Sequence, residues 1–182
     1  RYAMETLKEL RDERIKKLEK LKELGIDPYP PHAKKDANNE EVVNNYQKFE
    51  NEEIFLTGRV HSLREHAEIY FIDVYDSSGK IQFYIKDNEI EPTDAKKQIL
   101  GFSDMHLLDI GDFIQAKGVV TKTKSGEVSL LVKELTLLAK AVRPLPDKHE
   151  GLKDQETIFR RRYLDLAVNP ESREMFKRKS KF

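Results

Sequence analysis

Residues 54–138 contain five short runs in which apolar and polar residues alternate, and this period of two limits the possible folds more than any other feature. The runs are rich in β-branched and aromatic residues and are separated by turn residues, so each predicts a β-strand. We expect strands at 54–63, 69–75, 80–86, 113–122 and 128–138. After the third run, Thr93 predicts the cap of a helix from about Asp94 to Leu108.

Three strands, a helix and two further strands is the element order of the OB-fold, a partly open five-stranded Greek-key barrel. The predicted fold class is therefore an all-β core with helical extensions. Gly58 and Gly118 lie inside strand patterns, where small barrels need bends or bulges. A bulge at Gly58 would change the face to which later residues of the first strand point, which leaves the orientation of Arg64 open.

Both ends of the chain have helical patterns. Residues 3–24 predict one amphipathic helix, which Gly25 ends, and a connection with a short helix near 40–49 follows. After the barrel, a proline-containing linker at 143–146 precedes helical patterns at about 153–166 and from 171. We therefore divide the chain into residues 1–53, residues 54–138 as the barrel, and residues 139–182 as a linker that starts a further domain.

The composition excludes several classes of protein. The chain is 38% hydrophobic and 36% charged, and no apolar run approaches the length of a membrane span. Cysteine is absent, which rules out disulfides and thiolate metal sites and fits the cytoplasm. The histidines lack metal-ligand spacing, and we find no catalytic motif. The net charge of zero hides basic ends and a mildly acidic middle, so any nucleic-acid site must depend on a few local residues.

Alternation indicates which side chains face outward. Asp73 does not belong in a barrel core, so Phe71 shares the outer face with it. In the next strand Gln82 and Tyr84, with Lys80, form the polar face. An exposed ring beside an amide and cations suits single-stranded nucleic acid, because the ring stacks on a base and the amide reads its edge. The alternative is that Phe71 packs under the N-terminal helix, and alternation alone does not decide between the two.

Motifs along nearly the whole chain resemble the N-terminal part of class II lysyl-tRNA synthetases. The resemblance is carried by their order and spacing. The motifs are Glu23–Pro30, Gly58–Val60 and Phe71, Gly79–Gln82, Lys122–Ser129, Arg143–Lys148 and Arg160–Leu166.

The resemblance implies a role for individual residues. The family's stacking phenylalanine falls on Phe71 and its glutamine that reads the central anticodon uridine on Gln82. The partner arginine falls on Arg64, and an acid that contacts the first anticodon base falls on Glu127. Lys122 and Lys124, in the similar turn motif, are further candidates for RNA contact. Residues 65–68 are more acidic here than in the family, which puts backbone contacts of this loop to RNA in doubt.

The resemblance also implies an activity for the whole protein. A lysine–tRNA ligase uses ATP, with magnesium, to activate lysine and then charges tRNA(Lys), and it is expected to be a homodimer. Residues 169–182 are similar to the start of the first class II motif. We expect the chain to be a truncated piece with no catalytic residue, no metal site and no cofactor of its own. Its expected partner is the anticodon stem-loop of tRNA(Lys), and no membrane is involved.

Three alternatives remain open. The same domain occurs in aspartyl- and asparaginyl-tRNA synthetases, although the motifs at 122–129 and 143–148 favour the lysyl enzyme. A free-standing OB-fold that binds single-stranded nucleic acid leaves residues 139–182 unexplained and calls for a more basic site. A pure interaction module would use the N-terminal helix to bind a partner.

Overall fold

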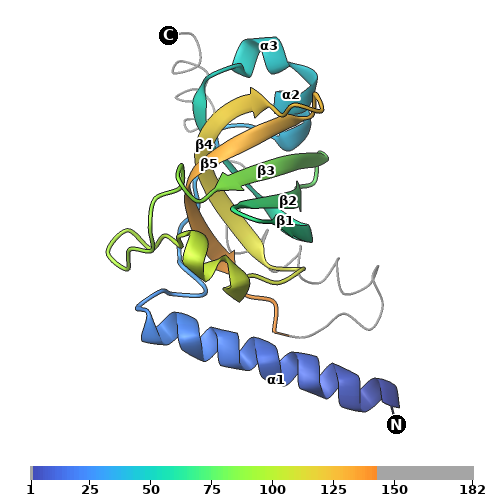
Figure 1. Ribbon diagram of the computed structural model, residues 1–182, viewed down its shortest axis with the longest axis vertical. Helices are drawn as coiled ribbons and strands as arrows, with labels where there is room; N and C mark the ends of the chain where they lie inside the picture. The colour runs from blue at the N-terminus through green and yellow to red at the C-terminus, as the bar shows by residue number, and fades with distance from the viewer. Residues whose placement is uncertain (1, 143–182) are drawn as a thin grey trace.

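The alternating segments place half of their side chains in a common interior, around which five strands close into a barrel (Figure 1). The computed structural model describes residues 2–142. The strands are β1 (Glu53–His66), β2 (Ile69–Tyr75), β3 (Lys80–Lys86), β4 (Phe113–Lys122) and β5 (Val128–Ala139). Their order around the barrel is β1-β2-β3-β5-β4. The predicted OB-fold is confirmed, but the barrel is closed rather than partly open, because β3 and β5 pair in parallel.

The core consists of the inward-facing residues of all five strands together with apolar residues from the loops. Ile72, Phe83 and Leu130 are fully buried at its centre. Leu100 and Met105, from the segment between β3 and β4, are buried in the same cluster. The segment therefore seals the barrel without supplying a strand.

Two glycines allow strands to cross closely. A Cβ atom on Gly58 would lie 2.7 Å from the Tyr75 carbonyl oxygen, and one on Gly118 would lie 2.3 Å from that of Leu131. Neither contact is possible for a side-chain carbon, so both strands need glycine at these points. The ladder of β4 and β5 also shifts register between Lys117 and Gly118, as expected for a glycine in a barrel strand.

The bulge in β1 lies after Gly58. The first half of β1 pairs with β4 and the second half with β2, and the register with β2 shifts between Val60 and Ser62. His61 is thus the extra residue. Since a shift of one residue exchanges the two faces of a strand, Arg64 points outward opposite Phe71.

The predicted helix from Asp94 to Leu108 is wrong. The structure has a 3-10 helix only at Phe102–Leu107, after a loop in which Asp94 bridges Ile99. Thr93 does not cap a helix: its hydroxyl accepts the Gly101 backbone N–H at 2.8 Å and contacts Asp104. Gln98 has a φ of 56°, which interrupts a right-handed helix, and its side chain bonds the Gly25 carbonyl oxygen at 2.9 Å. The segment is therefore shaped by its contact with the end of the N-terminal helix.

The connection before β1 holds two short helices, α2 (Asn39–Asn44) and α3 (Tyr46–Phe49), where a short helix was predicted. The amide of Asn39 donates to the backbone carbonyls of Val74 and Gly79, each at 3.2 Å. This contact fixes α2 beside the hairpin of β2 and β3.

The helix α1 (Tyr2–Glu23) lies across one end of the barrel (Figure 1). It ends in a Schellman motif, in which Gly25 at φ 79° allows the Ile26 N–H to reach the Leu21 carbonyl oxygen at 2.9 Å. Leu21 and Ile26 are buried, whereas Leu10 is 42% exposed. The buried side chain of α1 thus lies near its C-terminal end among those that the structure describes, although the sequence pattern predicts an apolar stripe along the whole helix.

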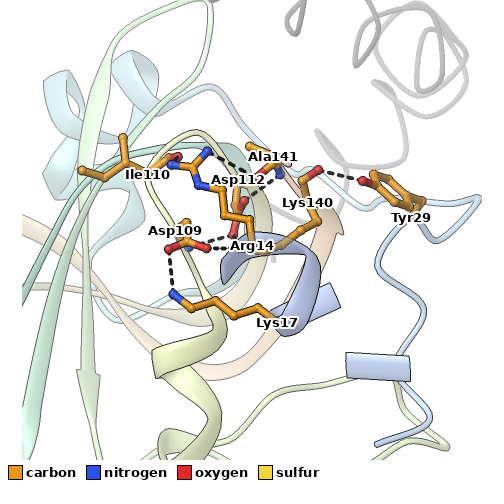
Figure 2. A network of polar contacts seen from close by, with 8 residues as sticks. All are labelled: Arg14, Lys17, Tyr29, Asp109, Ile110, Asp112, Lys140 and Ala141. Atoms are coloured by element: carbon orange, nitrogen blue, oxygen red, sulfur yellow. Dashed lines mark hydrogen bonds and ion pairs between the residues drawn. The ribbon is translucent and has the colours of Figure 1, made fainter. Parts of the chain in front are cut away.

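Polar contacts around Lys140 join α1 to the barrel (Figure 2). The fully buried Lys140 ammonium lies 2.6 Å from Asp109 and 2.7 Å from Asp112. On the helix side, Lys17 contacts Asp109 at 2.8 Å and Arg14 donates to the Ala141 carbonyl oxygen at 3.3 Å. The backbone N–H groups of Asp109 and Ala141 each donate to Asp112 at 2.8 Å.

Burial and hydrogen bonding have opposite effects on the two carboxyl groups of this cluster, Asp112 and Asp109. It raises the pKa of Asp112 to about 6, although Lys140 and the two backbone N–H groups oppose the shift. Burial also acts to raise the pKa of the half-buried Asp109, but hydrogen bonds from Lys140 and Lys17 outweigh it and leave that pKa lowered. Lys140 is thus the main compensation for the buried charge of Asp112.

No helix within residues 2–142 is both long enough and apolar enough to cross a membrane. The linker and helices predicted for residues 143–182 lie outside the described residues.

We predict that Lys140→Met lowers the free energy of unfolding by about 3–5 kcal/mol at pH 7, because it leaves the Asp112 carboxylate buried without a counter-charge. The loss should be smaller at pH 5. Without Lys140 the folded-state pKa of Asp112 rises further above its unfolded value, so stability falls as pH rises between the two values. Urea unfolding of both proteins at several pH values measures this.

Lys117→Met is the matched control for this test. Lys117 contacts Glu53 at 3.2 Å on the surface, where such a pair contributes about 0–1 kcal/mol. Equal losses from the two substitutions, or a Lys140→Met loss that does not depend on pH, would contradict the role assigned to the buried pair.

Candidate nucleic-acid interface

Three residues form one row across the outer face of β1, β2 and β3. Arg64 lies opposite Phe71, and Phe71 lies opposite Tyr84. The rings of Phe71 and Tyr84 are stacked, with centroids 5.1 Å apart and planes inclined by 21°. The Arg64 guanidinium lies 5.8 Å above the centre of the Phe71 ring. Phe71 is half-buried but is not part of the core cluster. The predicted outward face of Phe71 is confirmed, and the ring does not pack under α1.

A second, polar row runs beside the first. The register places Ser62, Asp73, Gln82 and Ser129 side by side on β1, β2, β3 and β5. The Ser62 hydroxyl donates to Asp73 at 2.8 Å, and the Ser129 hydroxyl donates to Gln82 Oε1 at 2.9 Å. Gln82 is only 4% exposed, so its side chain is held between neighbours rather than free in solvent.

Lys80 connects this row to the turn between β4 and β5. Its ammonium lies 3.4 Å from Asp73 and 3.7 Å from Glu127. Asp73 also lies 3.9 Å from Arg64, and its Oδ1 atom is buried without a hydrogen-bond partner among the described residues. The face therefore carries both signs of charge: Arg64 and Lys80 lie close to carboxylates, whereas the Lys86 ammonium lies 5.2 Å above the ring of Tyr84.

The structure brings four of the six predicted site residues together. Arg64, Phe71 and Gln82 share the outer face, and Glu127 reaches it through Lys80. Lys124 is exposed in the turn between β4 and β5. Lys122 points elsewhere, since its ammonium lies 4.5 Å above the ring of Tyr46 on α3. The two lysines therefore lie beside the face rather than on it.

Sequence reasoning missed one contributor to the face, Ser129, and one contact within it. Tyr84 was assigned to this face, but its stacking on Phe71 requires the register of β2 and β3. Ser129 looked like an ordinary strand residue, and its contact with Gln82 spans 47 positions of the chain. Only the expectation that an OB-fold pairs its third and fifth strands could have indicated it.

The loop between β1 and β2 is tight. Ala67 has a φ of 54°, and the rings of His66 and Phe71 meet edge to face at 6.2 Å. Glu65 and Glu68 are exposed beside this row. The acidic character predicted for the loop is thus on the surface, next to the aromatic residues.

The described residues hold no cluster of three or more histidine, aspartate or glutamate side chains that suits a metal ion. What the face offers chemically is stacking area, one fixed amide and paired charges.

Comparison with known proteins identifies the barrel. Residues 54–138 match the family described as OB-fold nucleic acid binding domain. The chain is 39% identical to a lysine–tRNA ligase of Thermotoga maritima over 181 residues, which cover 96% of this chain and 35% of that protein.

Two further lysine–tRNA ligases show the same extent of similarity. That of Syntrophomonas wolfei is 37% identical over 96% of this chain and 34% of its own length. That of Carboxydothermus hydrogenoformans is 39% identical over 93% of this chain and 33% of its own length. The chain thus spans about a third of the length of these relatives. Residues 54–138 thus match the family of OB-fold nucleic acid binding domains, and along nearly its whole length the chain is similar to the N-terminal third of lysine–tRNA ligases.

Proposed function

We propose that this chain recognises the anticodon of tRNA(Lys) as part of a lysine–tRNA ligase. The observation that carries the proposal is the outward-facing Phe71 ring, with Arg64 above it and the amide of Gln82 in the adjacent row. A base stacked on Phe71 gains about 1–3 kcal/mol, and a fixed amide beside it can read the base edge.

Each predicted site residue has a role in this proposal. Phe71 stacks on the central uridine, Gln82 reads its edge, and Arg64 covers its other side. Glu127 contacts the first anticodon base from the turn between β4 and β5. Lys122 and Lys124 contact phosphates beside the face.

The whole protein would activate lysine with ATP and magnesium and then charge its tRNA, as a homodimer in the cytoplasm. This part of the proposal rests on the similarity to lysine–tRNA ligases, of which the chain spans about a third. The described residues provide anticodon recognition only.

The charge pattern favours specific recognition over general binding of single strands. A free-standing single-strand binder tracks the backbone with a positive groove. Here Arg64 and Lys80 are both close to carboxylates. The related aspartyl and asparaginyl enzymes remain the second candidate, because they share a central uridine in the anticodon.

Binding of the 182-residue chain to a tRNA(Lys) anticodon stem-loop tests the proposal. Scrambled RNA and single-stranded DNA of equal length serve as comparisons, and the aspartate and asparagine stem-loops address the second candidate. Equal affinity for all of these ligands would overturn the proposal.

We expect Phe71→Ala to weaken binding of the stem-loop by about 1–3 kcal/mol, the contribution of one base stack. The fold should persist, because the ring lies outside the core cluster. Fluorescence anisotropy and thermal unfolding measure the two effects. Phe55→Ala is the control, since Phe55 is also half-buried beneath lysines but lies on β1 beside β4. If Phe55→Ala has the same effect on RNA affinity, the assigned face is wrong.

Gln82→Ala should reduce discrimination more than affinity. We expect cytidine in place of the central uridine to weaken binding of the wild type and to have little effect on the variant. The reason is that a buried polar group left unpaired by the wrong base costs about 1–3 kcal/mol. Dissociation constants for the two proteins with the two RNAs form a complete cycle, and undiminished discrimination in the variant would refute the assignment.

Lys124→Ala should weaken binding to all RNA sequences by a similar factor. If the ammonium contacts a phosphate, the slope of log K against log salt concentration should decrease by about one ion. Titrations between low and moderate salt measure this slope. Lys97→Ala, which removes an exposed lysine from the segment between β3 and β4, should leave the slope unchanged.

A further inference from the structure

We infer that Ser129 is a positioning residue that sets which bases the site accepts, because it fixes the amide of Gln82 with the amino group facing outward. This inference rests on the proposed function, since it concerns how the same site reads a base. It assigns the site to bases with a carbonyl oxygen at the read edge, uracil rather than cytosine.

The contact between the two side chains is short and buried. The Ser129 hydroxyl donates to Gln82 Oε1 at 2.9 Å, and its second neighbour, the Glu127 carbonyl oxygen, is farther away at 3.2 Å. Ser129 is fully buried and Gln82 is 4% exposed. Both side chains therefore have little freedom to rotate, and the pairing of β3 with β5 holds them in register.

The other end of the amide is unused. Among the described residues no acceptor takes a hydrogen bond from Gln82 Nε2, although the side chain is almost completely buried. The amino group is not one of the buried atoms sealed from solvent without a partner, so it retains an opening on the outer face. A hydrogen-bond donor in a nearly buried side chain is costly unless a ligand or water supplies an acceptor through such an opening.

The direction of the amide determines the chemistry of the ligand. With one lone pair of Oε1 bound by Ser129, Oε1 is held toward β5, and the N–H groups of Gln82 are left to meet a ligand. Uracil has a carbonyl oxygen at the position where cytosine has an amino group, which is itself a donor. An outward amino group can thus donate a hydrogen bond to the uracil carbonyl oxygen. With cytosine, two donor groups would face each other. Removing the hydroxyl would let the amide turn over and satisfy either base.

The test measures the ratio of the dissociation constants for stem-loops with a central cytidine and a central uridine, using the 182-residue chain. We expect Ser129→Ala to reduce this ratio by about tenfold, as for the loss of one oriented hydrogen bond, while binding of the uridine RNA changes little. Thr121→Ala is the matched control. Thr121 pairs with Ser129 on the other side in the same row and has no hydrogen bond to Gln82 among the described contacts. It should leave the ratio unchanged.

A purely structural role of Ser129 gives a different result. Ser129→Ala would then weaken binding of both RNAs by the same factor and leave the ratio intact, which overturns the inference. If Ser129→Ala does not fold, Ser129→Cys decides instead, because a thiol fills the same site but is only a weak hydrogen-bond donor to Gln82 Oε1. Loss of the uridine preference supports the inference, and a retained preference overturns it. If the wild type itself shows no preference, the proposed reading by Gln82 fails, which is distinguishable from failure of the Ser129 assignment alone.

Discussion

The parallel pairing of β3 with β5 is the contact on which both the barrel and its outer face depend. It involves three residue pairs, Gln82 with Ser129, Phe83 with Leu130, and Tyr84 with Leu131. The middle pair is fully buried and closes the core. The first pair joins the two polar side chains of the face, and the turn just before β5 brings Glu127 to Lys80. Because the paired strands are distant in the chain, the contact of Gln82 with Ser129 forms only when the barrel closes, whereas the row of Arg64, Phe71 and Tyr84 needs only β1, β2 and β3.

The strand β5 is also fixed at its other end. Lys140 follows β5 directly and inserts its ammonium between Asp109 and Asp112. A buried pair of this kind adds little net stability compared with apolar residues, but breaking it is costly. Its main effect is therefore to define one position for the polypeptide around it. Arg14 and Lys17 of α1 bind to the same cluster, so the helix has a specified site on the barrel.

Local patterns predicted the strands well, because alternation and turn residues are read within a few positions. β2, β3 and β4 have the predicted bounds. The helix predicted after Thr93 does not form. Gln98 donates instead to the Gly25 carbonyl oxygen just after α1, and the Gly101 N–H donates to the Thr93 hydroxyl; no local pattern predicts these contacts. Alternation with Asp73 placed Phe71 on the outer face but did not exclude packing under α1, and the orientation of Arg64 depended on a bulge at His61 that the residue types do not mark. The contact of Ser129 with Gln82 was beyond local reasoning for the same reason: it exists only once the barrel is closed.

The charges on the face explain how a chain of zero net charge can suit a polyanion. Arg64 and Lys80 lie near Asp73, and Lys80 also lies near Glu127. A phosphate must compete with these carboxylates for each cation, so attraction to an arbitrary strand is weak. In the proposed complex, a base that stacks on Phe71 and accepts a hydrogen bond from the amino group of Gln82 would gain free energy that no carboxylate of the protein can supply. The balance of charge thus weakens binding to every RNA and leaves the contribution of the matching base unchanged. The matching base then supplies a larger share of the total free energy of binding.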